Sequence, residues 1–309
     1  MLFRSVRRAF STGAALWAAF FAATYPMLAF YAPQLMSETP TLLLIALSLW
    51  LAWRGRSGSL RWLVPLGISL GWAMLTREIM FPAAGLVVLW LLANPPERRL
   101  TVRHVGRVAL VALLMTAVLV PWWVRNYRVT GEFIPITDAG GARLWYANNP
   151  YAAEMGGGEL GGALGNMARI PEVEALPEGE RDAAYERRAR QFIAEDPMRF
   201  LGLSFRRQIS MWHLSYHGSG KREIVFLLYY WPLLALAVVG AVRAWMVNRS
   251  ALLLLGITPF VVAGVSAVFQ GVGRYRVPAE LIFCALGGIA TAWIVRRLGE
   301  RFRRRPAAA

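Results

Sequence analysis

The chain has 309 residues, 57% of them hydrophobic, and its mean hydropathy is +0.42. This composition excludes an ordinary soluble domain, because several apolar runs are long enough to cross a hydrocarbon core of about 30 Å. The net charge of +16 comes almost wholly from arginine, since Lys221 is the only lysine, and it does not lead us to predict nucleic-acid binding. The single cysteine, Cys284, excludes an intrachain disulfide and a cysteine-based metal site.

Eight apolar runs are predicted to be transmembrane helices, which makes the chain an all-α, polytopic membrane protein. In chain order they cover residues 9–31, 39–54, 61–76, 79–93, 104–124, 224–246, 250–269 and 277–297. The third and fourth are short for a full span. The predicted organisation is about five transmembrane helices in 1–124, one large extracytoplasmic loop region with amphipathic helices in 125–223, about three transmembrane helices in 224–298, and a basic cytoplasmic tail in 299–309.

Arginines gather at alternate connections between the predicted helices and at both ends of the chain. The clusters are Arg4, Arg7 and Arg8; Arg54, Arg56 and Arg61; Arg98, Arg99 and Arg103; Arg243 and Arg249; and Arg296, Arg297, Arg301, Arg303, Arg304 and Arg305. With eight spans, all these clusters fall on one side, which the positive-inside rule assigns to the cytoplasm. The sequence therefore predicts a multi-pass protein of the bacterial inner (plasma) membrane, surrounded by membrane lipids, with both termini cytoplasmic.

The region 125–223 has a pattern of its own. Residues 156–162 hold five glycines and are predicted to form a loop. Residues 178–195 read as a polar helix that stops near Pro197. Residues 198–214 read as a basic amphipathic helix that we expect to lie along the membrane surface. Its apolar residues are Phe200, Leu201, Phe205, Ile209 and Trp212, and its charged residues are Arg199, Arg206 and Arg207.

The fifth apolar run passes directly into a polar, aromatic stretch that reads Pro121-Trp122-Trp123-Val124-Arg125-Asn126-Tyr127. A related stretch follows about twenty residues later and reads Leu144-Trp145-Tyr146-Ala147-Asn148-Asn149-Pro150. One interpretation is the aromatic belt that membrane helices carry at their ends. The other is a site for a lipid-borne phosphate and a sugar, because guanidinium groups pair with phosphate oxygens and aromatic faces cover sugar rings.

Ionisable residues also gather on the predicted outer side. Glu38 either holds a ligand or stabilises the start of a helix, where the positive end of the helix dipole attracts a carboxylate. A structural ion pair between Glu38 or Glu78 and an outer arginine is a further alternative. The remaining outer arginines are suited to phosphate because of their planar fork, although interfacial snorkelling would also explain them. They are Arg77, Arg125, Arg274 and Arg276.

His213 and His217 are four residues apart and could share one face of a helix. They lack a third ligand at a recognisable spacing, so the sequence predicts surface histidines there and no metal site.

Several short pieces occur in a characteristic order along nearly the whole chain. They are Tyr25-Pro26 with Ser37-Glu38; Gly71 through Thr76-Arg77-Glu78; Pro121-Trp122 with Arg125-Asn126-Tyr127 and Gly131; Trp145 with Asn148-Asn149-Pro150; Tyr185 through Pro197; and Arg274-Tyr275-Arg276 with Pro278. In this order they resemble the membrane glycosyltransferases of the GT-C superfamily. Within it, the pieces are most similar to the family 39 or arabinose-transferase-like group, which is related to the protein mannosyltransferases.

The resemblance implies an inverting transfer of a sugar from a polyprenyl-phosphate carrier to a hydroxyl of a cell-envelope acceptor on the extracytoplasmic side. In that chemistry a carboxylate acts as general base on the acceptor, and cations stabilise the departing lipid phosphate. The implied donor-phosphate residues are Arg77, Arg125, Arg274 and Arg276. The implied sugar or acceptor site contains Trp145, Tyr146 and Asn148.

The chain departs from the family at its catalytic base. Members of this group carry their principal aspartate in the first extracytoplasmic loop, whereas no Asp precedes Asp138 in this sequence. We therefore expect the chain to begin at about the third or fourth span of the family and to lack the N-terminal part. Glu38 and Glu78 are weak candidates for the base.

Two functions follow as hypotheses. The first is a GT-C glycosyltransferase, which without the family aspartate could be inactive on its own. The alternative is a non-enzymatic membrane protein that binds a lipid phosphate or acts as a partner subunit. No motif states which sugar or acceptor is used, and a divalent metal cofactor stays an open alternative.

Overall fold

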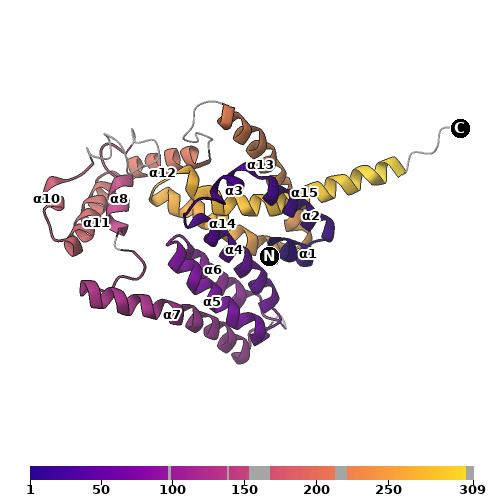
Figure 1. Cartoon of the computed structure of the whole chain (residues 1–309), viewed down its shortest axis with the longest axis horizontal. Coiled ribbons are helices and arrows are strands. Elements are labelled where there is room, and N and C mark those ends of the chain that lie inside the picture. The colour runs from indigo at the N-terminus through magenta and orange to yellow at the C-terminus, as the bar shows by residue number, and fades with distance from the viewer. Residues whose placement is uncertain (97–98, 138, 153–167, 213–220, 304–309) are drawn as a thin grey trace. The chain divides into compact units, whose positions relative to one another are not determined.

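The structure is a computed structural model that describes residues 1–96, 99–137, 139–152, 168–212 and 221–303 (Figure 1). All regular structure in these ranges is helical, which confirms the predicted all-α class. The chain forms two compact units. Unit 1 consists of Met1–Thr116, Gly220–Pro259 and Val277–Ala309, and unit 2 consists of Ala117–Ser219 and Phe260–Arg276. The glycine-rich residues 156–162 and the two histidines His213 and His217 lie outside the described ranges.

Four of the described helices are long and apolar enough to cross a membrane. The spans are Val102–Thr130, Leu227–Val247, Arg249–Val268 and Gly273–Arg301. They lie in α7 (Val102–Thr130), α13 (Lys221–Val247), α14 (Arg249–Val268) and, after the short helix η1 (Gly273–Arg276), α15 (Val277–Arg303). These four correspond to the last four predicted spans, and they confirm a polytopic membrane protein. The earlier predicted spans are shorter helices.

The predicted helix over residues 9–31 is wrong as one continuous element. The chain instead forms α1 (Leu2–Ala9), α2 (Thr12–Thr24) and α3 (Pro26–Tyr31). Ser11 starts α2, and its side chain accepts a hydrogen bond of 3.1 Å from the backbone N–H of Ala14. At Tyr25 the backbone is extended, with φ −69° and ψ 116°, because a proline follows and disfavours the helical conformation of the residue before it.

In unit 1, α4 (Glu38–Gly55), α5 (Leu60–Thr76) and α6 (Met80–Ala93) lie side by side (Figure 1). The hydroxyls of Ser48 on α4 and Ser69 on α5 are 2.9 Å apart in the buried contact between these two helices. Since α4 and α5 run in opposite directions through a short connection, the start of α4 meets the end of α5. The same hairpin brings the end of α4 to the start of α5.

Glycines allow α15 to pack closely against α2 and α13 in unit 1. A Cβ atom on Gly240 of α13 would come within 1.9 Å of the Leu286 carbonyl oxygen of α15. A Cβ atom on Gly288 would come within 2.5 Å of the Ala14 carbonyl oxygen of α2. Small residues that let backbones approach are typical of helix contacts in membranes.

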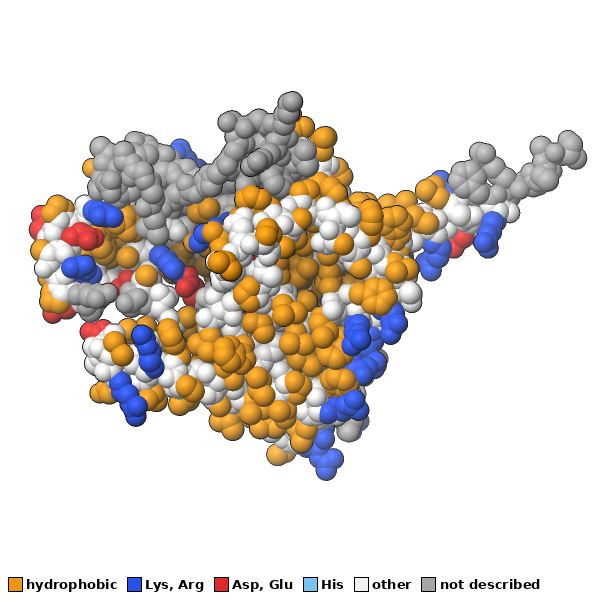
Figure 2. Space-filling view, viewed as in Figure 1, with side chains coloured by type: hydrophobic (Ala, Val, Ile, Leu, Met, Phe, Trp, Pro, Cys, Tyr) orange, Lys and Arg blue, Asp and Glu red, His pale blue; other side chains and the backbone are white. Residues whose placement is uncertain are grey.

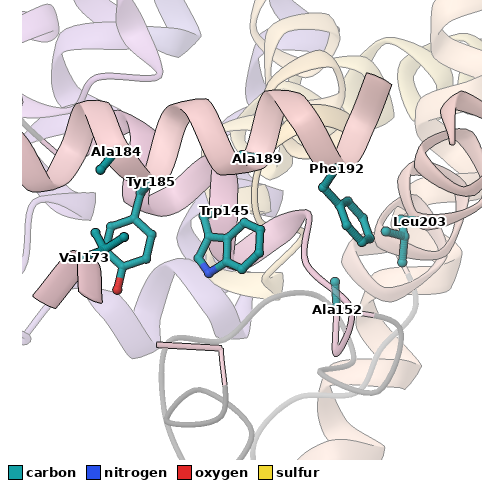
Figure 3. Packing of buried hydrophobic residues seen from close by; sticks show 8 residues of the cluster. All are labelled: Trp145, Ala152, Val173, Ala184, Tyr185, Ala189, Phe192 and Leu203. Carbon is teal, nitrogen blue, oxygen red and sulfur yellow. The ribbon is translucent and has the colours of Figure 1, made fainter. Parts of the chain in front are cut away.

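Unit 2 contains α8 (Gly140–Ala147), α10 (Pro171–Glu174), α11 (Glu178–Glu195) and α12 (Pro197–Trp212). The predicted polar helix over 178–195 is therefore confirmed as α11. Figure 3 shows the indole of Trp145 beside α11, between the side chains of Tyr185 and Phe192. The hydrophobic core of this unit consists of Trp145, Ala152, Val173, Ala184, Tyr185, Ala189, Phe192 and Leu203.

The predicted amphipathic helix over 198–214 is observed as α12. Of its three charged residues Arg199, Arg206 and Arg207, the last has a buried side chain, on the same face as Leu203 and Met211. The exposed face carries an apolar stripe whose members are three or four residues apart, which are Met198, Leu201, Phe205 and Ile209. The helix therefore places apolar side chains outward and one guanidinium inward.

Candidate functional site

Glu38 and Arg77 form a buried ion pair in unit 1. The Nη1 atom of Arg77 donates to Oε1 of Glu38 over 3.0 Å, and the two side chains are 9% and 2% exposed. Of the alternatives that the sequence left open, the structure shows the pairing of Glu38 with an arginine, which is Arg77. The pair therefore combines one predicted base with one predicted phosphate-binding residue.

The hairpin geometry of α4 and α5 creates this pair. Glu38 is the first residue of α4, where the helix dipole favours a negative charge. Arg77 follows the last residue of α5 and is extended, with φ −152° and ψ 132°, so that its side chain leaves the axis of the helix. The two helix ends meet at one end of unit 1, and this brings both residues together.

Two further carboxylates belong to unit 1. Glu78 is half-buried in the turn that connects α5 to α6, and its carbonyl accepts a hydrogen bond of 2.9 Å from the N–H of Phe81. Glu280 lies in the first turn of α15 and is fully buried. The sequence places Glu280 just after Arg274-Tyr275-Arg276, but no site role was predicted for it, although an acid at the start of an apolar helix is a signal of function.

In unit 2, the aromatic stretch at the end of α7 holds the chain that follows it. The indole of Trp122 donates to the Ile136 carbonyl over 3.3 Å, and the indole of Trp123 donates to the Pro135 carbonyl over 2.7 Å. The amide of Asn126 donates to the next carbonyl, that of Ile134, over 3.2 Å. We call these three contacts the α7 clip. The side chains that the sequence suggested as an aromatic belt or a ligand site therefore hydrogen-bond to the backbone of residues 134–136, which follow them in the chain.

Arg125 and Arg274 are exposed, whereas the third arginine of unit 2 that the sequence selected is not. Arg125 lies over the Trp122 ring at 5.4 Å, and Arg274 lies over the Tyr275 ring at the same distance of 5.4 Å. Arg276 is fully buried, and its Nη1 atom donates to the Met211 carbonyl over 2.8 Å. Only the first two therefore present guanidinium groups at the surface of this unit.

The predicted sugar or acceptor residues lie on or just after α8 and are buried. The Trp145 indole donates to the Ala168 carbonyl over 2.6 Å, and the Tyr146 ring packs against Tyr185 with centroids 6.0 Å apart. Asn148 donates from Nδ2 to the Val268 carbonyl over 3.0 Å. The three side chains therefore contribute to the interior packing and hydrogen bonding of unit 2.

Arg207 connects this segment to the rest of unit 2, and the sequence analysis missed that role. Its guanidinium donates to the carbonyls of Ala147 and Ala267, at 2.5 and 2.6 Å, and to Ser204 Oγ at 3.1 Å. Two longer contacts of 3.4 Å reach Oδ1 of Asn148. Burial lowers the pKa of Arg207 to about 10, so the side chain stays charged at neutral pH. The spacing in the sequence is one signal of this burial, since Arg207 comes four residues after Leu203 and therefore lies on the same face of the helix.

Asp182 fixes the start of α8. Its two carboxylate oxygens accept hydrogen bonds of 2.9 and 2.8 Å from the backbone N–H groups of Gly141 and Ala142. A carboxylate at a helix N-terminus accepts hydrogen bonds from N–H groups that have no partner within the helix, and its negative charge is attracted by the positive end of the helix dipole. Nearby, burial raises the pKa of Tyr185, and the hydrogen bond that Tyr185 donates to Glu174 raises it further.

Within the described ranges, no group of three or more His, Cys, Asp and Glu side chains is placed to hold a metal ion.

Comparison with known proteins gives one family. Residues 1–124 match the family described as Dolichyl-phosphate-mannose-protein mannosyltransferase, a family of the GT-C superfamily. The matched segment is less than half of the chain, and it includes Glu38, Arg77 and Glu78. No curated protein and no solved structure matches the chain. The family match confirms the predicted resemblance: over its first 124 residues, this membrane protein is similar to glycosyltransferases of the GT-C superfamily.

Proposed function

We propose that the chain is a membrane glycosyltransferase of the GT-C type that moves a sugar from a polyprenyl-phosphate-linked donor to a hydroxyl of a cell-envelope acceptor. The observation that carries the proposal is the family match over residues 1–124, which contain the buried pair of Glu38 and Arg77. An ionised pair buried at the ends of apolar helices is expensive to keep, and such pairs in membrane proteins often mark functional sites.

The proposed reaction is a single displacement. The acceptor hydroxyl oxygen attacks the anomeric carbon while a carboxylate takes its proton, and the bond between that carbon and the phosphate oxygen breaks. The products are the glycosylated acceptor and the polyprenyl phosphate, which keeps the bonding electron pair. Guanidinium groups would stabilise the charge that develops on the departing phosphate.

We assign the carboxylate role to Glu38 or Glu78, both of which lie in the segment that matches the family. Arg77 is a cation in direct contact with Glu38. Arg125 and Arg274 are the further phosphate candidates with exposed guanidinium groups, whereas Arg276 is assigned a supporting role because it is buried. Trp145, Tyr146 and Asn148 would act on the sugar or acceptor site by holding its shape, since they are buried as well.

The test is transfer by the purified protein in proteoliposomes. The donor is radiolabelled polyprenyl-phosphate-mannose, because the matched family is described by a mannose donor of this kind, and the acceptor is a cell-envelope extract. We expect label to move to the extract, and we expect Arg274→Ala and Glu38→Gln to abolish the transfer. Arg187→Ala is the matched control, because Arg187 is an exposed arginine on α11.

Each outcome decides a part of the proposal. Equal transfer by wild type, Arg274→Ala and Glu38→Gln would reject the assigned residues while keeping the enzyme. Saturable retention of the donor without any transfer would favour the alternative, a membrane protein that binds a lipid phosphate without catalysis. Neither transfer nor retention would reject both functions. The melting temperature of each variant is measured first, so that unfolded protein is not scored as inactive.

We also propose that unit 2 faces the extracytoplasmic side of a bacterial inner membrane and that both termini are cytoplasmic. A cysteine introduced at the exposed Gln191 of α11 should react with a membrane-impermeant maleimide added to intact spheroplasts. The native Cys284 is buried and serves as the internal unreactive control. Labelling of Gln191→Cys only after the membrane has been opened would overturn this orientation.

A further inference from the structure

Two arginines stack on one tryptophan at the end of the α4–α5 hairpin that lies away from Glu38. Arg54 is in the last turn of α4 and Arg61 is in the first turn of α5. Their Cζ atoms are 4.2 Å and 4.6 Å from the centroid of the Trp62 ring. Two guanidinium groups therefore share one aromatic side chain, which concentrates two positive charges at a single point of unit 1.

Helix α1 adds two more arginines to this point. Arg4 lies over Trp50 at 5.8 Å, and the Trp50 ring packs against Trp62 with centroids 5.2 Å apart. Arg8 and Arg61 both repel the charge of Arg54. The helices that carry these residues are in contact, since α1 packs on α4 and α4 packs on α5. We call Arg4, Arg8, Arg54 and Arg61, with Trp50 and Trp62, the basic aromatic cluster.

The cluster has no negative counterpart in the described part of the chain. The ion pairs described in unit 1 join Arg77 to Glu38 and Arg296 to Glu300, and none reaches the cluster. The Nε–H group of Arg54 is shielded from solvent and has no hydrogen-bond partner among the described residues. Aromatic faces attract a cation but do not neutralise it, so this donor and these charges suit an added anion.

The surface beside the cluster indicates what kind of molecule brings that anion. On α5 an exposed apolar stripe starts next to Arg61 and continues along the helix at intervals of four residues. It consists of Leu60, Val64, Ile68 and Trp72. Figure 2 shows basic side chains of unit 1 along one edge of a broad hydrophobic surface. A charged headgroup at this edge can therefore continue into acyl chains that lie along apolar side chains.

We propose that the basic aromatic cluster binds the phosphate of an anionic membrane lipid, with the acyl chains along the exposed stripe of α5. Arginine suits this phosphate because its planar fork makes two parallel, charge-assisted hydrogen bonds. The site is separate from the proposed sugar-transfer site, because α4 rises about 24 Å between Glu38 and Arg54 at about 1.5 Å per residue. The inference does not depend on the proposed enzymatic activity.

The test is lipid binding by the whole 309-residue chain in detergent, followed by native mass spectrometry. The two probes are phosphatidylglycerol and phosphatidylcholine with identical acyl chains. We expect wild type to bind phosphatidylglycerol more tightly, and we expect Arg54→Gln with Arg61→Gln to weaken that binding roughly thirtyfold. Arg187→Gln with Arg188→Gln removes the same charge from exposed positions of α11 and should leave the binding unchanged.

A second variant tests the planar geometry of the guanidinium group rather than its charge. Arg54→Lys with Arg61→Lys keeps both charges and should lie between wild type and the glutamine variant. Equal affinity of the glutamine variant and the α11 control would overturn the proposal. So would equal binding of the two lipids by wild type. Displacement of the lipid by an equal concentration of glycerol phosphate would show that the cluster binds a soluble phosphate and would overturn the proposal of a lipid site.

Discussion

The Nη1 atom of Arg77 lies 3.0 Å from Oε1 of Glu38, although the two residues are 39 positions apart in the chain. Both side chains are almost completely buried, whereas the pair of Arg190 and Glu186 on α11 is exposed, with side chains 75% and 41% accessible. Burial decides what such a pair contributes. Removal of one partner of a buried pair leaves an uncompensated charge, while an exposed pair is screened by water.

Glu38→Gln should therefore destabilise the protein strongly. Loss of the carboxylate removes the negative charge that lies 3.0 Å from the buried guanidinium of Arg77, and we expect the free energy of unfolding to fall by about 3–5 kcal/mol. Arg77→Gln should have an effect of similar size. The double variant should be less destabilised than the sum of the two, because neither charge is then left alone.

Glu186→Gln, which breaks the exposed pair, is the matched control and should change the free energy of unfolding by less than about 1 kcal/mol. The measurement is reversible denaturation in mixed micelles. Additive effects of Glu38→Gln and Arg77→Gln in the double variant would contradict the contact between them.

Gly240→Ala should separate two helices of unit 1. The new Cβ atom would come within 1.9 Å of the Leu286 carbonyl oxygen, and a backbone atom of a neighbouring helix cannot rotate away as a side chain can. We expect a loss of about 1–3 kcal/mol, as for overpacked cores.

Gly256→Ala is the control for this prediction, because a Cβ atom there would meet nothing within 4 Å. Alanine is the better helix former, so this variant should be neutral or slightly stabilised. Thermal unfolding of both variants gives the comparison. Equal melting temperatures of Gly240→Ala and Gly256→Ala would show that α13 and α15 are not packed as closely as described.

Arg207→Lys should destabilise unit 2 in spite of the retained charge. A lysine ammonium cannot reach the Ala147 and Ala267 carbonyls together, whereas the fork of Arg207 does so now. We expect a loss of about 2–4 kcal/mol from the buried acceptors that lose their donor. Arg206→Lys, at the exposed neighbouring position, should have no measurable effect.

The effect of Arg207→Lys should be independent of pH near neutrality. Burial lowers the pKa of Arg207 from its ordinary value to about 10 in the folded protein, so the folded and unfolded states are both protonated near neutral pH. Above about pH 10 the unfolded chain binds more protons than the folded one, and this group would then make stability rise with pH. The measurement is denaturation at pH 6 and pH 8. A difference between wild type and Arg207→Lys that varied across this range would contradict the assigned protonation.

Asn126→Ala should loosen the α7 clip. The variant loses the hydrogen bond from Asn126 to the Ile134 carbonyl, which is worth about 1 kcal/mol, so local opening should become about fivefold more frequent. Cleavage after Glu132 by a glutamyl endopeptidase reports that opening. Val129→Ala, at an exposed position of the same helix, should cleave like wild type. An unchanged cleavage rate in Asn126→Ala would show that the hydrogen bond from Asn126 to the Ile134 carbonyl does not stabilise the α7 clip.

Local patterns in the sequence predicted the helical elements well where a long apolar run or a polar helix stood alone. The polar helix over 178–195 matches α11, and the last four apolar runs match long apolar helices. The prediction failed at Tyr25, because the apolar run continues through a proline and hydropathy alone does not register a break. The pattern also did not indicate the burial of Arg207, because buried carbonyl oxygens can bind a guanidinium group as water does.

The chemistry of the candidate residues was visible in the sequence, but their partners were not. Residue types alone identified Glu38, Arg77, the α7 aromatic stretch and the arginines near η1, since ions and indoles at membrane boundaries are restricted in what they can do. Only the tertiary structure decided that Glu38 binds Arg77, that the clip fastens its own loop, and that Arg54 and Arg61 share Trp62. The reason is physical: composition and periodicity record the local preference of each residue for apolar or polar surroundings, whereas an ion pair or a cation on an indole depends on which helix ends the packing brings together.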